Sequence, residues 1–380
     1  MRTGTFFFAV TLLFASCHSG NRPAVNLNNA GITAKYTASH FRIDDYKGYR
    51  RLVITNPWQN TSGTELVYYL VSQGTKLPDT IPESSVIRVP VKRIVCMSTT
   101  HTAMLRALDA ADIIVGISGT GLVYDSLVLD AVHRGMIPDV GYESNIDKEL
   151  VVSLRPDLLM AYGVGASSAE YLRKLEEMGV KVMYNADYLE EHPLARCEWI
   201  RVFGLLTGKE DMADSLFRAV SAAYISLADM VRAKVKDFPA VLLGSPWEDV
   251  WYISPGNSYI GRLISDAGGK YLFDDLREPN SVPFSVEAVF RRATEADIWI
   301  NPGTAGNLGD IAAADHRMTK LPVYRSGSIW NNRNRITPAG GNDYWESAVV
   351  RPDLLLEDMV SIIHPDLIPD YKQLYYRRLE

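Results

Sequence analysis

A long helical run between two similar halves of the chain limits the folds available to it. Over residues 193–239, apolar side chains recur at three- and four-residue steps, as on one face of a helix, at Met212, Leu216, Val220, Ala223, Leu227 and Val231. Gly204 and Gly208 interrupt the run, so we predict helices over 194–206 and 210–234, the second ending before Pro239. The second helix would span roughly 35 Å, enough to join two lobes. The alternative is a long surface helix within one domain.

Strands alternate with helices on both sides of this run. The strands are predicted at 93–97, 113–117, 158–161, 180–184, 241–243, 251–253 and 298–300, with a short strand and turn at 138–141. The helices are predicted at 103–108, 148–154, 169–178, 260–267, 286–293 and 354–363. Such alternation is typical of mostly parallel sheets covered on both faces. The run from Ala111 to Val115 also echoes the run from Ala296 to Ile300, which favours a duplication.

The predicted fold is therefore α/β, with two Rossmann-like lobes at 91–192 and 239–380 joined by a rigid helical linker at 193–238. Residues 34–90 contain short β-like runs at 41–43, 51–55 and 65–71, separated by Gly, Pro and Asn. We interpret them as a β-rich extension in front of the first lobe.

The N-terminus has the composition of a secretory signal. Arg2 supplies positive charge, residues 6–14 are apolar but too few to span a membrane, and residues 15–16 are small. Cys17 follows directly, and the run from Leu13 to Cys17 resembles a bacterial lipobox. We expect a signal peptide at 1–16, lipidation of Cys17 and a polar tether at 17–33, which would hold the protein at the cell envelope on the outer side of a membrane. A plain cleaved signal with an incidental cysteine is the alternative.

Composition narrows the function classes. The chain of 380 residues has a net charge of -6 and no basic stripe, which argues against a nucleic-acid partner. Its seven His are scattered, and motifs for dinucleotides, phosphate loops, nucleophilic serines and zinc hydrolases are missing. Cys96 and Cys197 are predicted to be buried thiols rather than a disulfide. We therefore expect a monomeric binding protein, with no catalytic residues, no dedicated metal site and no cofactor of its own.

The candidate ligand site comprises the loops that follow the predicted strands, because ligands of parallel sheets lie beyond the carboxyl ends of the strands. These loops supply aromatic, amide, hydroxyl and cationic side chains: Ser98, Thr99, His101, Tyr124, Tyr142, Tyr162, Trp247, Trp251, Tyr252, Trp330, Asn332, Arg333, Arg335, Tyr344 and Trp345. Aromatic faces suit a flat or macrocyclic ligand, and Arg suits its anionic groups. Any one of the aromatic residues could instead be packing, and His101 could simply cap or pack at the start of its helix.

Several motifs resemble those of the helix-hinged, class III substrate-binding proteins of ABC importers, which serve ferric siderophores, haem and cobalamin. The resemblance runs from about Val91 to the C-terminus. Its most specific pieces are the run from Pro138 to Gly141 and the run from Glu149 to Leu159. The run from Asn342 to Glu346 resembles an iron-complex branch of that class.

The resemblance implies a membrane permease as partner, onto which one surface glutamate of each lobe docks. It places these at Glu149 and, with a looser match, at Glu287, although either could be an ordinary solvated residue. It also implies a largely preformed cleft, since a long helix resists large hinge closure.

The function predicted from the sequence is capture of an iron complex, a ferric siderophore or haem, by a lipid-anchored protein that delivers it to an ABC permease. Cobalamin is the second candidate ligand, and the Trp-rich second lobe would suit its ring. The sequence also leaves open a secreted α/β enzyme acting on a cofactor, or a carrier of free Zn or Mn.

Overall fold

The computed structural model describes residues 38–142, 145–163 and 166–380, and the side chains of 166–169 are not described. The predicted signal peptide, the lipidation site at Cys17 and the tether at 17–33 lie outside the described residues. Residues 38–380 belong to one compact unit. No described helix is both long enough and apolar enough to cross a membrane.

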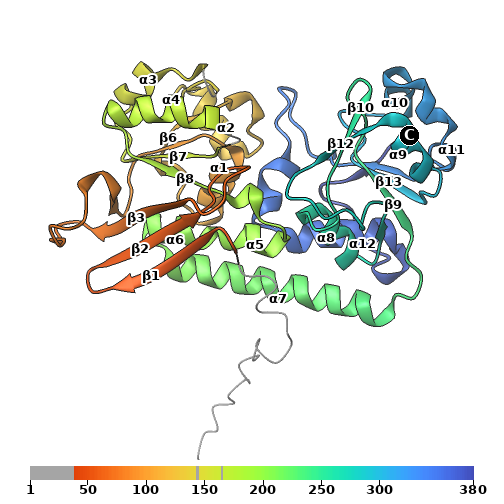
Figure 1. Cartoon of the computed structure of the whole chain (residues 1–380), viewed down its shortest axis with the longest axis horizontal. Coiled ribbons are helices and arrows are strands. Elements are labelled where there is room, and N and C mark those ends of the chain that lie inside the picture. The colour runs from red at the N-terminus through yellow and green to blue at the C-terminus, as the bar shows by residue number, and fades with distance from the viewer. Residues whose placement is uncertain (1–37, 143–144, 164–165) are drawn as a thin grey trace, which may run out of the picture. The chain divides into compact units, whose positions relative to one another are not determined.

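The N-terminal lobe is built on a parallel four-stranded sheet in the order β6-β5-β7-β8. Its strands are β5 (Ile94–Cys96), β6 (Ile114–Ile117), β7 (Leu158–Ala161) and β8 (Val182–Tyr184). Its helices are α1 (Thr99–Ala107), α2 (Ser126–His133), α3 (Lys148–Ser153) and α4 (Ala166–Glu177), shown in yellow and orange in Figure 1. All residues of β5, β7 and β8 are buried, as expected for strands covered on both faces.

The C-terminal lobe holds a second sheet in the order β11-β9-β13-β14-β15, parallel except for its last strand. Its strands are β9 (Ala240–Leu243), β11 (Lys270–Tyr271), β13 (Ile298–Ile300), β14 (Ile329–Asn331) and β15 (Arg377–Arg378). Its helices are α8 (Tyr259–Asp266), α9 (Val286–Ala293), α10 (Leu308–Ala314), α11 (Pro322–Ser326) and α12 (Pro352–Ile363). The predicted strand at 251–253 lies outside this sheet, because β10 (Val250–Ile253) pairs antiparallel with β12 (Val282–Ser285).

The two lobes repeat one topology, which confirms the predicted fold class. If the strands of each sheet are counted in chain order, the first strand lies between the second and the third, and the fourth strand pairs with the third. The carboxylate of Asp157, before β7, accepts the N–H groups of Lys92 and Arg93 at 2.8 and 3.0 Å, and Asp297, before β13, accepts the N–H of Ala240 at 2.8 Å. The predicted echo of Ala111–Val115 with Ala296–Ile300 joins strands that are not equivalent, because the first run leads into β6, whereas the counterpart of β13 is β7.

The linker region consists of α5 (Pro193–Glu198), α6 (Ile200–Thr207) and α7 (Glu210–Lys234). The helix predicted over 194–206 is divided in two at Trp199. Gly204 lies inside α6, where an added Cβ would come within 2.6 Å of the Ala213 side chain, so this glycine permits close packing of α6 on α7. Gly208 ends α6 in a left-handed conformation with φ 70°.

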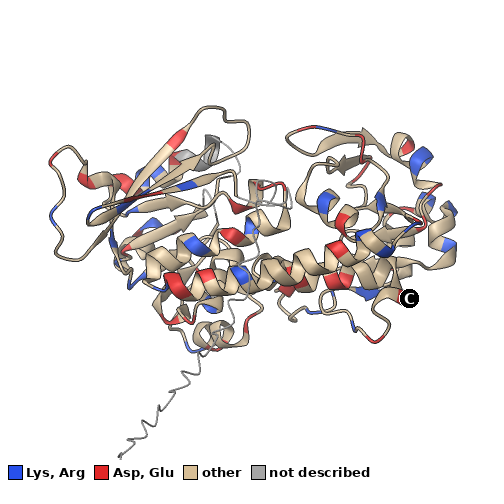
Figure 2. Cartoon of the chain, turned by 90° about the horizontal axis from the view of Figure 1, so that it is seen from below, with Lys and Arg blue, Asp and Glu red and all other residues tan. Residues whose placement is uncertain are grey.

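Helix α7 has the predicted bounds and runs along both lobes, with charged side chains spread over its length (Figure 2). Its buried face is rotated from the predicted one: Ala213, Val220, Tyr224, Ala228 and Val231 are buried. Met212 is 41% exposed. The periodicity therefore predicted the helix correctly but placed its first turn on the wrong side.

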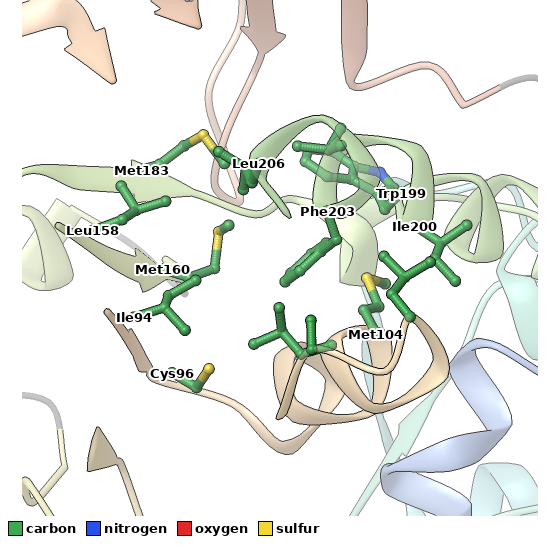
Figure 3. Close-up of a cluster of buried hydrophobic side chains, with 14 of the residues drawn as sticks. Ile94, Cys96, Met104, Leu158, Met160, Met183, Trp199, Ile200, Phe203 and Leu206 are labelled. Carbon is green, nitrogen blue, oxygen red and sulfur yellow. The ribbon is translucent and has the colours of Figure 1, made fainter. Parts of the chain in front are cut away.

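The β-rich extension is a four-stranded sheet in the order β1-β2-β3-β4, with only the last pair parallel. Its strands are β1 (Phe41–Tyr46), β2 (Tyr49–Thr55), β3 (Glu65–Ser72) and β4 (Val86–Val89). Leu52, Ile54 and Leu70 are buried in the same hydrophobic cluster as α1, α6 and the N-lobe sheet. Figure 3 shows the centre of this cluster, where Phe203 and Trp199 of the linker lie near Met104 and Met160. The extension is therefore part of the N-terminal lobe.

Candidate functional site

Residues of both lobes meet at the carboxyl ends of the N-lobe strands, and Thr99 and Trp345 form the first contact. The Thr99 hydroxyl, in the first turn of α1, donates to the Trp345 carbonyl at 3.3 Å. The Trp345 side chain is 55% exposed and packs edge-on against Tyr344 at 4.7 Å between ring centroids. A small cavity of about 40 Å³, here called the floor cavity, lies beside them and is also lined by Arg196 and Tyr259.

The second contact joins the loop after β6 to the C-terminal lobe. The N–H groups of Tyr124 and Asp125 donate to the two oxygens of the Glu346 carboxylate at 2.6 and 3.1 Å. The guanidinium of Arg335 lies 5.0 Å from the centroid of the Tyr124 ring and binds Asp343 at 2.7 Å. Burial raises the pKa of Glu346 to about 7, against the opposing effect of the two N–H donors.

These groups border a cavity of about 630 Å³, here called the side cavity. Its charged lining consists of Arg106, Asp125, Arg335, Asp343 and Glu346. Arg106 pairs with Asp125 at 3.0 Å, so guanidinium groups face the cavity from both lobes. Its volume lies within the range of ordinary small-molecule sites.

The loop after β6 is shaped by Asp139 of the Pro138–Gly141 motif. Its carboxylate accepts the N–H groups of Gly119, Thr120 and Gly141 at 2.8 to 3.1 Å, and the Thr120 hydroxyl at 3.0 Å. Burial by itself would raise the pKa of Asp139, but these donors outweigh it and the pKa is lowered. Residues 138–141 form only an isolated bridge to Ile117, not the predicted short strand.

A further cavity of about 450 Å³, here called the C-lobe cavity, lies where β9 and β13 end. Trp247, 74% exposed, and the buried Trp299 line it together with Asp310. Glu248 and Asn301, in the loops after these strands, have positive φ of 55° and 54°. Such backbone strain in non-glycine residues is concentrated at functional sites.

Three of the predicted ligand residues belong to the core instead. His101 is fully buried against Phe203, with ring centroids 6.0 Å apart, and burial lowers its pKa to about 3. Trp251 is fully buried, packs near Trp299 and donates its indole N–H to the Leu243 carbonyl at 3.2 Å. Asn332 is 5% exposed and accepts a bond from Asn342 through its carbonyl. His101 lies in the first turn of α1, Trp251 lies within β10 and Asn332 follows β14, and all three are buried.

The other predicted residues are distributed around these contacts. Ser98 caps α1 by accepting the Thr100 N–H at 3.2 Å. Tyr344 is buried, and its hydroxyl meets that of Tyr259 at 3.0 Å. Tyr142 and Tyr252 are exposed, whereas Tyr162, Trp330 and Arg333 are half-buried.

Sequence reasoning missed several charged residues near these contacts. Arg106, Asp125 and Arg196 lie within helices or caps whose pattern gave no signal, and Glu346 was noticed only as part of a motif. Among residues 38–142, 145–163 and 166–380, no group of three or more His, Cys, Asp or Glu side chains could hold a metal ion.

Two α/β lobes of one topology, a helix that joins them and cavities lined from both sides define a helix-hinged substrate-binding protein. The chain belongs to the periplasmic binding protein family, whose model matches residues 94–325. This confirms the resemblance to the class III binding proteins of ABC importers. The family consists of solute-binding proteins rather than enzymes.

Similar proteins extend over most of the chain. An uncharacterized lipoprotein of Methanocaldococcus jannaschii is 24% identical over 98% of this chain and 94% of its own length. An uncharacterized ABC transporter substrate-binding lipoprotein of Bacillus subtilis is 27% identical over 76% of this chain and 86% of its own.

Solved structures share the fold. A periplasmic haem-binding protein of Pseudomonas aeruginosa has a TM-score of 0.56 at 18% identity, over 76% of this chain and 98% of its own. A periplasmic vitamin B12 binding protein of Vibrio cholerae has a TM-score of 0.53 at 13% identity, over 73% of this chain and 99% of its own.

Proposed function

We propose that this protein is a lipid-anchored substrate-binding protein that captures an iron complex, a ferric siderophore or haem, between its lobes and delivers it to an ABC permease. The observation that carries the proposal is the side cavity, where Arg335 of one lobe covers Tyr124 of the other. Aromatic faces suit flat or macrocyclic ligands, and guanidinium groups suit their carboxylate or catecholate oxygens.

The open aromatic surfaces support a bulky ligand rather than a free ion. Trp345 and Trp247 are 55% and 74% exposed, so both offer open aromatic faces that a bulky ligand could cover. The similar haem-binding protein also serves a flat metal chelate.

Cobalamin is the second candidate ligand. It is favoured by the exposed Trp247 in the C-lobe cavity and by the similar fold of the vitamin B12 binding protein. A corrin would lie on aromatic surfaces without needing Arg106 or Arg335, which distinguishes it from an anionic iron complex.

Glu149 and Glu287 are proposed as the permease-docking residues. Both are exposed, and both lie in the first turn of helices, α3 and α9, that precede equivalent strands of the two sheets. Glu287 differs because its carboxylate binds Arg317 at 3.0 Å. The repeated topology thus presents one carboxylate on each lobe, a spacing that a permease could recognise electrostatically.

The test is titration of the purified monomer with a ferric siderophore panel, haem and cobalamin, monitored by quenching of tryptophan fluorescence. We expect saturable binding of an anionic iron complex, and recovery of the ligand chemically unchanged. Replacing Arg335 with Gln should weaken binding of that complex about tenfold, as expected for loss of one charge-assisted contact. Tight binding of cobalamin alone would favour the second candidate, and binding of none would refute the proposal.

A further inference from the structure

The β-rich extension at 38–89 is added to the two-lobed fold that the family shares. The family match begins at residue 94, after the last strand of the extension. The similar haem-binding protein is covered over 98% of its length by only 76% of this chain. What the added sheet contributes is therefore a property of this chain.

Two buried carboxylates, Glu198 of α5 and Glu190 shortly before that helix, hold the start of the extension. Glu198 accepts the N–H of Ala38 at 2.7 Å, and Glu190 accepts the N–H groups of Ser39 and His40 at 2.9 and 3.1 Å. Hydrogen bonds to carboxylates are stronger than neutral ones. Because its strands also share the core of the N-terminal lobe, the sheet is a fixed platform for the loop that leaves the same end, after Thr55 of β2 pairs with His40.

That loop, residues 56–64 between β2 and β3, lies where ligands of parallel sheets bind. Trp58 forms a parallel bridge with Gly163, which follows β7, and its ring lies 5.3 Å from Tyr184, the last residue of β8. A Cβ at Gly163 would come within 3.2 Å of the Trp58 side chain. The loop is therefore packed against the carboxyl ends of both strands.

The same loop reaches the opposite lobe. The side-chain amide of Asn280, between β11 and β12, donates to the side-chain oxygen of Asn60 at 3.0 Å. A cavity of about 210 Å³, here called the polar cavity, lies behind this contact and is lined by Gln59, Tyr188, Asn257 and Tyr259 among others. Tyr259 lines both the polar cavity and the floor cavity, so the two cavities are neighbours.

We infer that loop 56–64 is a wall of the ligand site and that Gln59 and Asn60 help to determine its specificity, an inference that rests on the proposed function. Asn60 is exposed and Gln59 is half-buried, so both amides can exchange solvent or protein contacts for a ligand. The contact between Asn60 and Asn280 closes this side of the space between the lobes.

The lining predicts the chemistry of the ligand group that faces this wall. The charged residues around the polar cavity are Glu190, Glu191 and Glu278, and neither Arg nor Lys lines it within the described chain. A carboxylate of the ligand would be repelled here, whereas hydroxyl, amide or ammonium donors would be paired. The ligand group that faces this wall is therefore a hydrogen-bond donor rather than an anion.

The experiment compares three proteins: wild type, the double variant Gln59→Ala/Asn60→Ala, and the control Gln73→Ala. Gln73 is an exposed amide of the same sheet, at the opposite end of β3. The probes are ferric enterobactin, haem and cyanocobalamin, with affinities from tryptophan quenching. Hydrogen exchange of the wild type, with and without the probe it binds, reports on loop 56–64 independently of the folding of any variant.

We expect the double variant to bind the probe about tenfold more weakly, the loss of two hydrogen bonds, while the control binds as the wild type does. The probe should also slow exchange in 56–64. Unchanged affinity of the double variant, or protection of 335–346 without protection of 56–64, would overturn the inference and leave the proposed function standing. If the wild type binds no probe, the proposed function fails and the inference fails with it.

Discussion

Replacing Glu346 with Gln should remove a large part of the pH dependence of folding stability. This carboxylate is 2% exposed and holds the N–H groups of Tyr124 and Asp125 across the lobes. Burial, helped by the nearby charges of Asp125 and Asp343, raises its pKa from an ordinary value of 4.5 to about 7. A glutamine keeps the shape of the side chain but cannot titrate.

The direction follows from where the proton is held. Between pH 4.5 and 7 the folded protein keeps a proton on Glu346 that the unfolded chain releases. The contribution of this proton to the free energy of unfolding is fully present below pH 4.5 and is lost as the pH rises through 7. At about 1.4 kcal/mol per pH unit, the free energy of unfolding should fall by about 3 kcal/mol over this interval because of Glu346.

The assay is urea unfolding of wild type and variant at pH 5 and pH 8, followed by tryptophan fluorescence. Other groups titrate equally in both proteins, so the difference between them isolates Glu346. We expect the stability of the variant relative to wild type to rise by about 3 kcal/mol from pH 5 to pH 8. The exposed control Glu149→Gln should show a constant difference. If the Glu346→Gln difference is also constant, the contact across the lobes does not hold a buried carboxylate.

Three further predictions concern packing, docking and anchoring. Gly204→Val should destabilise the protein by about 1–3 kcal/mol, because a Cβ already comes within 2.6 Å of Ala213; an unchanged unfolding midpoint would contradict the close packing of α6 on α7. Charge reversal at both Glu149 and Glu287 should abolish cellular uptake of the ligand while its affinity for the purified protein stays within about twofold of wild type, and normal uptake would remove the docking assignment. Cys17→Ser should move the protein from the membrane to the soluble fraction on cell fractionation, whereas retention at the membrane would refute lipidation.

Local patterns predicted most of the elements of this fold. The apolar runs of β5, β7 and β8 are short and continuous, which is typical of strands buried on both faces, and Pro and Gly delimit α7 at both ends. The resemblance of the Pro138–Gly141 motif also indicated the family, and the structure supplies the reason for the motif, because Asp139 organises the loop after β6.

The candidate site was predictable only as a set of loops. Thr99, Tyr124, Arg335 and Trp345 lie at contacts between the lobes, as strand order suggested. His101 and Trp251 occupy equally suitable positions in the sequence, yet their side chains point inward. Which way a side chain at a strand end points depends on the packing of neighbouring elements, and one sequence position carries no signal for it.

The sequence by itself determined the α/β alternation, the long linker helix and the family, because these depend on periodicity and on motifs within a few tens of residues. Only the tertiary structure decided that Glu346 joins the lobes, that Gly204 is a packing site and that the extension reaches the C-terminal lobe through Asn60. Glu346 and its partner Tyr124 are 222 positions apart in the sequence, and Asn60 and its partner Asn280 are 220 positions apart. No local pattern encodes such a pairing.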